Sequence, residues 1–114
     1  TATRRAGSPG FSLLLLETTS NAMERALHEG RRDEVRERAE KLPRTVKELD
    51  RRARSMEPAL PDPAHAVVLD LSNCATRVYA HARDDDDPAL RAELDELRQL
   101  IASMQGYLRE REGP

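Results

Sequence analysis

Apolar residues recur at alternating intervals of four and three residues in three separate segments of the chain. The first segment runs from Arg31 to Glu57, the second from Pro63 to about Arg83, and the third begins at Asp87. The repeating positions are Val35, Ala39, Leu42, Val46, Leu49, Ala53 and Met56, then Ala64, Val68, Leu71, Ala75, Val78 and Ala82, then Leu90, Leu94, Leu97, Ile101, Met104 and Leu108. This spacing places one apolar stripe along a helix and leaves the other faces to polar side chains. Each segment is therefore predicted to form an amphipathic helix.

The first part of the chain predicts a fourth helix, from about Pro9 to Glu29. Ser8 before Pro9 has the order of an N-cap followed by a proline in the first turn, and Gly30 stands where a glycine commonly ends a helix. The apolar residues of this segment include Phe11, Leu15, Leu16, Ala22, Met23, Ala26 and Leu27. The polar run 18–21 interrupts them, so the amphipathic pattern is weaker here than in the other three helices.

Prolines mark the remaining helix boundaries. The stretch from Pro58 to Pro63 cannot continue a helix, and we expect Asp62 to cap the next helix with Pro63 in its first position. Asp87 and Pro88 repeat this order before the last helix. Short connections make successive helices antiparallel. The predicted fold is an all-α, antiparallel up-down four-helix bundle.

Pro43 interrupts the second predicted helix near its middle. A proline inside a helix removes one backbone donor and clashes with the carbonyl four residues earlier, here that of Ala39. We therefore expect the second helix to be kinked or broken at Pro43.

Length and composition indicate one small domain. The chain has 114 residues, of which 35% are charged and 3% aromatic. We assign residues 8–111 to a single helical-bundle domain and residues 1–7 to a flexible N-terminal arm without apolar periodicity. Because much of the apolar stripe is Ala and Val, the core is light, and a second copy or a bound peptide would add stability.

The charge balance and the single Cys74 restrict the partners and the compartment. The formal net charge is -2, which gives no global field for nucleic acid or anionic lipid, and no apolar run approaches the length of a membrane span. A lone cysteine fits a reducing compartment, so we expect a cytoplasmic protein. Arg4 and Arg5 precede an apolar run, but Glu17 ends that run too early for a secretory signal.

No constellation of residues predicts a catalytic, cofactor or metal site. Glu37 and Glu40 have the spacing of paired magnesium ligands, but the second acidic pair of all-helical nucleotide pyrophosphohydrolases is missing. The acidic run 84–87 lacks the pattern of a calcium loop and is better interpreted as a cap for the last helix. Cys74 and His81 are two helical turns apart, too far for a nucleophile and its base. We therefore expect no catalytic residues, no cofactor and no metal.

Several segments together resemble a known family. Ser8 and Pro9 open a Leu-rich helix, a charged helix with Leu42 and the run 47–50 follows, and an Asp-Pro corner precedes a Leu-rich last helix. The matching positions of the last two helices are Leu71, Arg77, Ala82, Asp87, Pro88, Leu90, Leu97 and Leu100. Over residues 8–108 this order resembles the flagellar export chaperones of the FliS kind, although Leu16-Glu17-Thr18 replaces the Leu-Tyr-Asp of their first helix and Ser72 an aromatic residue of their third. The resemblance implies a helical bundle that offers apolar grooves to an amphipathic segment of a partner.

The run of four leucines from Leu13 to Leu16 indicates where a partner binds. Four consecutive residues cover about 300° of a helix, so one core cannot bury all of them. We predict that Leu13, Leu14, Leu15 or Leu16 contributes to a homodimer or partner surface. Two functions follow as hypotheses: a non-enzymatic cytoplasmic chaperone or adaptor that binds an amphipathic helix, and a magnesium-dependent nucleotide pyrophosphohydrolase-like enzyme or regulator.

Overall fold

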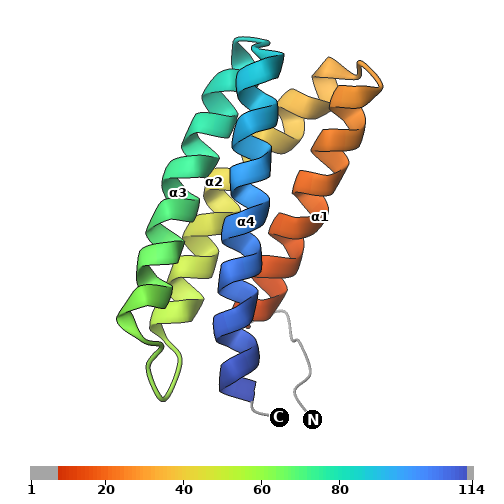
Figure 1. The fold of residues 1–114 in the computed structure, drawn as a ribbon. Helices are drawn as coiled ribbons and strands as arrows, with labels where there is room; N and C mark the ends of the chain where they lie inside the picture. Colours follow the sequence, from red (N-terminus) through yellow and green to blue (C-terminus); the bar gives the residue numbers. More distant parts are fainter. Residues whose placement is uncertain (1–7, 113–114) are drawn as a thin grey trace.

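The computed structural model describes residues 8–112, which form four α-helices. Their bounds are Pro9–His28 (α1), Arg32–Arg54 (α2), Asp62–Arg83 (α3) and Asp87–Glu112 (α4). Each helix packs on the next along the chain, and α1 also packs on α4, which closes the bundle. Figure 1 shows the start of α1 and the end of α4 at the same end of the bundle. The predicted antiparallel up-down bundle is confirmed, while the predicted arm of residues 1–7 lies outside the described residues.

The boundaries of α1 follow the sequence signals. The hydroxyl of Ser8 accepts a hydrogen bond from the backbone N–H of Phe11 at 3.1 Å, which satisfies one of the free donors of the first turn. At the other end Gly30 adopts φ +75°, and its N–H donates to the carbonyl of Leu27. The next N–H, of Arg31, donates to the carbonyl of Ala26. These two bonds form a Schellman motif, which a glycine completes without strain.

The helix α2 is not broken at Pro43. It runs as one helix from Arg32 to Arg54, with Pro43 inside it. Pro43 removes a single hydrogen bond, and the buried side chains of Leu42 and Val46 hold the helix against the core on both sides of it. In Figure 1 the two halves of α2 slant differently relative to α4.

Two of the predicted caps were assigned to the wrong residue. The helix α3 begins at Asp62 itself, with Pro61 at the N-cap position and no side-chain cap. The helix α4 is capped by Asp86, whose Oδ1 accepts from the backbone N–H of Ala89 at 3.3 Å. Asp87 is engaged elsewhere: both of its carboxylate oxygens accept from the guanidinium of Arg32, each at 2.9 Å. Asp87, which the sequence pattern predicted as the cap of α4, therefore binds α2 instead.

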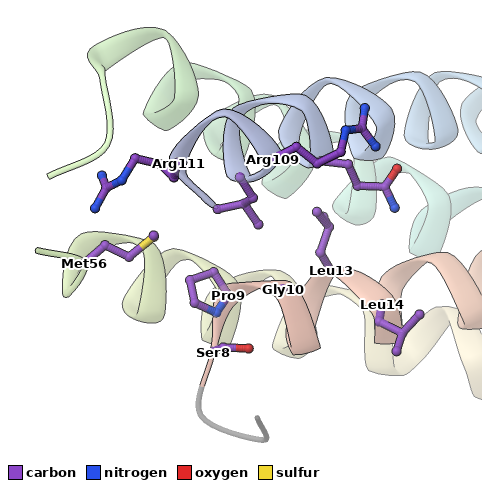
Figure 2. Close-up of a pocket in the computed structure, with 10 residues that line it drawn as sticks. Ser8, Pro9, Gly10, Leu13, Leu14, Met56, Arg109 and Arg111 are labelled. Atoms are coloured by element: carbon purple, nitrogen blue, oxygen red, sulfur yellow. The ribbon is translucent and has the colours of Figure 1, made fainter. Parts of the chain in front are cut away.

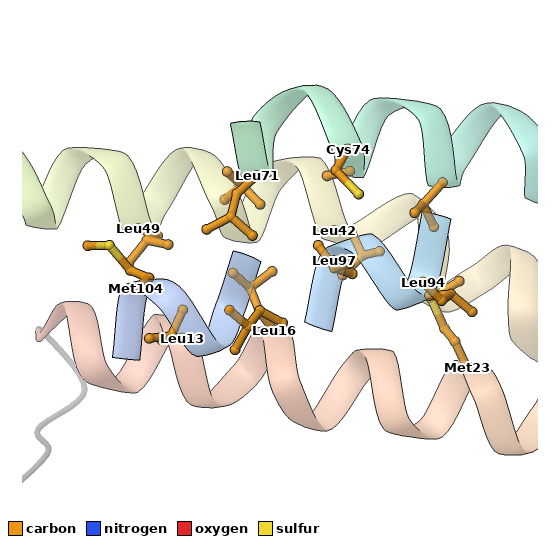
Figure 3. Packing of buried hydrophobic residues seen from close by; sticks show 14 of the residues in the cluster. Leu13, Leu16, Met23, Leu42, Leu49, Leu71, Cys74, Leu94, Leu97 and Met104 are labelled. Carbon is orange, nitrogen blue, oxygen red and sulfur yellow. The ribbon is translucent and has the colours of Figure 1, made fainter. Parts of the chain in front are cut away.

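The core runs along the bundle axis and is built from the predicted stripes. The largest fully buried side chains are Leu13, Leu16, Met23, Leu42, Leu49, Leu71, Leu90, Leu94, Leu97, Met104, Val46 and Val68. Figure 3 shows leucines from all four helices meeting in this core. Phe11, Tyr79 and Tyr107 are only partly buried, so the fully buried part of the described core contains no aromatic side chain. None of the four described helices is long and apolar enough to cross a membrane.

Candidate partner-binding surface on α1

The four leucines of α1 separate into two buried and two exposed residues. Leu13 and Leu16 are 2% and 0% exposed and belong to the core. Leu14 and Leu15 are 38% and 43% exposed. Leu13 and Leu16 therefore stabilise the bundle itself, because each packs inward among its helices. We call the outward-facing residues Phe11, Leu14 and Leu15 the leucine face of α1.

Leu14 borders a pocket of about 220 Å³ at the end of the bundle. Pro9 and Gly10 of α1 form one wall together with Leu13, and Met56 extends it after the end of α2. Figure 2 shows Arg109 and Arg111 of α4 on the opposite side. Three segments that are far apart in the sequence meet here, so no local motif could have indicated the pocket.

Leu15 and Phe11 border a second, more open groove of about 600 Å³ between α1 and α2. The two side chains lie one turn apart on α1 and supply an apolar strip. The α2 wall is strongly charged, with five cations and two carboxylates, which gives a net charge of +3. The charged residues of the wall are Arg44, Lys47, Arg51, Arg52, Arg54, Glu48 and Asp50.

Ion pairs within α2 neutralise only part of the positive charge of this wall. Glu48 pairs with Arg51 and Arg52, and the hydrogen bond from Arg51 is the main cause that lowers the pKa of Glu48 below its usual value. Asp50 pairs with Arg54 at 3.0 Å. Among residues 8–112, Arg44 and Lys47 make no ion pair.

Arg52 of α2 lines this groove and connects α2 to α1. Its Nη1 donates to the hydroxyl of Ser12 at 2.8 Å, and Ser12 is 1% exposed. Its Nε lies 2.9 Å from Glu48 Oε1, in a geometry that falls short of a hydrogen bond. A charge-assisted bond to a buried hydroxyl holds α1 and α2 together beside the leucine face. The sequence pattern does not indicate this contact, because Ser12 and Arg52 are 40 residues apart in the chain.

A second polar cluster lies between α3 and α4, around Glu93. Its carboxylate accepts from Arg77 Nε at 2.7 Å and lies 3.8 Å from both His81 Nε2 and Cys74 Sγ. Burial is the main cause that raises the pKa of the Cys74 thiol to about 12, and the charge of Glu93 adds to it. The thiol is therefore held in its protonated, unreactive form. The sequence pattern did not indicate that a glutamate of α4 faces this thiol.

The candidate magnesium ligands remain on the surface. Glu37 and Glu40 are both exposed on α2, and Glu37 pairs with Lys41 at 3.8 Å. Within the described part of the chain, no group of three or more His, Cys, Asp or Glu side chains is placed to hold a metal ion.

Comparisons with protein-family models, with curated proteins and with solved structures find no match to this chain. The function is therefore argued from the surface of the bundle.

Proposed function

We propose that the protein is a small non-enzymatic interaction protein, a chaperone or adaptor that binds an amphipathic helical segment of a partner on the leucine face of α1. One observation carries this proposal: Leu14 and Leu15 are exposed side by side next to two buried leucines. Large apolar side chains that cluster on the surface of a small protein mark interaction sites more often than isolated ones do.

The shape of the surface supports a helical ligand. The pocket beside Leu14 can take one anchoring side chain, and the groove beside Leu15 runs between two antiparallel helices. An amphipathic helix that lies in such a groove presents apolar residues at intervals of three and four positions. The light aliphatic core would gain stability from this additional burial.

The charges around the leucine face define the partner further. Arg109 and Arg111 stand on the α4 side, and the unpaired Arg44 and Lys47 stand on the α2 side. A partner helix with acidic residues on both sides of its apolar stripe complements this arrangement. The flagellar export role implied by the resemblance is one specific form of this proposal, and a cytoplasmic location fits the single buried thiol of Cys74.

The test compares two labelled peptides of about 18 residues with the same apolar stripe, one flanked by Glu and one by Lys. Fluorescence anisotropy measures their binding to the wild type and to the variants Leu14→Glu and Leu15→Glu. We expect the Glu-flanked peptide to bind and at least one of the two variants to weaken that binding by about tenfold or more.

The control is Leu69→Glu, because Leu69 is 62% exposed on α3 and lies outside the leucine face. Circular dichroism shows whether each variant keeps its helicity. A wild type that binds neither peptide, or binding that Leu14→Glu, Leu15→Glu and Leu69→Glu affect equally, would refute the proposal.

A further inference from the structure

The outer face of α2 carries a continuous stripe of charged residues opposite its buried side. The seven residues of this stripe are Asp33, Glu37, Glu40, Arg44, Lys47, Arg51 and Arg54, and all are exposed. Their spacing alternates between four and three, which keeps them on one face of the helix. Among the described elements α2 packs on α1 and α3, so this face is covered by no other helix. We call it the α2 charge stripe.

The sign of the α2 charge stripe changes once, near its middle. The first three residues are acidic and the last four are basic. The first six are placed symmetrically about Leu42: Glu40 and Arg44 are two residues away, Glu37 and Lys47 five, and Asp33 and Arg51 nine. Every acid on one side of Leu42 is therefore matched by a base at the same distance on the other side.

The stability of a single helix does not account for the middle of this pattern. Acids near a helix N-terminus and bases near its C-terminus favour the helix dipole, but that effect is confined to the first and last turns. Glu40 and Arg44 lie in the middle of α2. They are one turn apart in the orientation that favours an ion pair, yet within residues 8–112 neither makes one. Lys47 is likewise without an ion pair in the described part of the chain.

We infer that the α2 charge stripe binds the same stripe of a second copy, with the two α2 helices antiparallel about a two-fold axis at the level of Leu42. In that register Glu40 of each copy faces Arg44 of the other. Glu37 faces Lys47 and Asp33 faces Arg51, each pair occurring twice. The two-fold operation requires a self-complementary surface, and this stripe has one. A parallel arrangement would bring like charges together at every level.

The interface is small and polar, which determines its behaviour. From residue 33 to residue 51 the stripe spans about 27 Å, at 1.5 Å per residue. Exposed ion pairs contribute little individually and are screened by salt. The dimer is therefore weak, reversible and sensitive to ionic strength. The dimer and the proposed partner share part of their surface, because Arg44, Lys47 and Arg51 also line the groove beside Leu15, whereas Glu37 and Glu40 lie outside both hollows beside the leucine face.

The experiment uses charge reversal at one symmetric pair. Sedimentation velocity at about 50 mM salt measures the self-association of the wild type, Glu37→Lys, Lys47→Glu and the double variant. Each single variant places two pairs of like charges in the interface, so we expect each to dimerise about tenfold or more weakly than the wild type. The double variant restores opposite charges at both pairs and dimerises again.

Mixing the two single variants gives the sharpest test. The Glu37→Lys copy is basic at both positions of the pair and the Lys47→Glu copy is acidic at both. The two variants therefore associate with each other although neither associates with itself. Glu96→Lys is the matched control, because it makes the same charge change at an exposed position of α4. We expect it to leave dimerisation unchanged, and about 500 mM salt to weaken the wild-type dimer by about tenfold or more.

Three results would overturn the inference. They are a wild type that stays monomeric at low salt and high concentration, a dimer that the single reversals do not weaken, and a mixture that associates no better than its components. Leu14→Glu separates this proposal from the previous one, because Leu14 lies outside the α2 charge stripe, so the variant leaves the α2 dimer intact whatever its effect on peptide binding.

Discussion

Single residues at the ends of helices show how local conformation and tertiary contacts compete. Asp85 follows α3 with φ 54°, a left-handed conformation in which glycine is the usual residue. Its N–H and that of Asp86 close a Schellman motif on the carbonyls of Ala82 and His81. Its carboxylate compensates by pairing with Arg36 at 2.5 Å. Asp85 therefore has a strained backbone conformation, and its side chain forms an ion pair with α2.

We predict that Asp85→Gly is more stable than Asp85→Ala by about 1 kcal/mol. Both variants lose the carboxylate, so their difference isolates the cost of a Cβ at positive φ. Urea denaturation of the two proteins measures it. At Asp84, which adopts φ -88°, the order should reverse, with Ala more stable than Gly. The same order at both positions would contradict this account of the α3 terminus.

The thiol of Cys74 should react slowly in the folded protein. Its pKa is raised to about 12 from an ordinary value of 9.0, so at pH 8 its thiolate fraction is roughly a thousandfold lower. Burial hinders the reagent further. We expect the rate with a disulfide reagent such as Ellman's reagent to fall by about a thousandfold or more between the unfolded and the native chain.

The raised thiol pKa also gives a stability change with a definite sign. The folded state holds the proton of Cys74 to a higher pH than the unfolded state does. The contribution of the Cys74 thiol to the free energy of unfolding is therefore complete below pH 9 and is lost as the pH rises from about 9 towards 12. Cys74→Ala should lose less stability over this range. An equal loss in both proteins, or a native thiol that reacts as fast as an unfolded one, would show that burial does not control this group.

At the scale of whole elements, α2 continues through a proline at which the sequence predicted a kink or a break. The hydrogen-bonding capacity of one carbonyl, that of Ala39, is left without its helical partner at Pro43. The apolar stripe on both sides of it still matches the core, and burying the stripe outweighs one lost bond.

We predict that Pro43→Ala stabilises the protein by about 1 kcal/mol. Alanine restores the backbone donor, and the gain exceeds the entropy that proline removes from the unfolded chain. Thermal or urea denaturation measures the change. Pro88→Ala is the matched control, since Pro88 lies in the first turn of α4, where no helical partner exists for its N–H. A Pro43→Ala protein less stable than the wild type would show that α2 requires the proline.

At the scale of the whole molecule, the magnesium-dependent alternative makes a prediction about stability. An ion that binds the native state raises the melting temperature through mass action. Glu37 and Glu40 are exposed on α2, and α2 pairs Glu37 with Lys41. We therefore expect millimolar Mg²⁺ to leave the melting temperature unchanged, as differential scanning fluorimetry would show. A rise that Glu40→Gln abolishes would instead support the enzyme hypothesis.

The sequence by itself determined the helices and their buried stripes. Apolar residues spaced three and four apart lie on one side of a helix, whereas in a strand they would alternate between its two faces. The apolar stripes of α2, α3 and α4 could therefore be identified from the sequence. The roles of Ser8 and Gly30 at the ends of α1 could also be predicted from the sequence, because a cap and a left-handed turn are formed by neighbours in the chain. The exposure of part of the leucine run followed from helix geometry alone.

Only the tertiary structure decided which residues meet. Whether Leu14 and Leu15 or their neighbours face outward depends on how α1 is rotated against α2 and α4. The pocket beside Leu14 requires the end of α4 and Met56 to lie near Pro9. The diversion of Asp87 to Arg32 and the position of Glu93 opposite Cys74 also join distant segments. A periodic pattern predicts which face of a helix is buried. Packing determines the partners of each residue at the margin of that face, and the leucine face of α1 lies at such a margin.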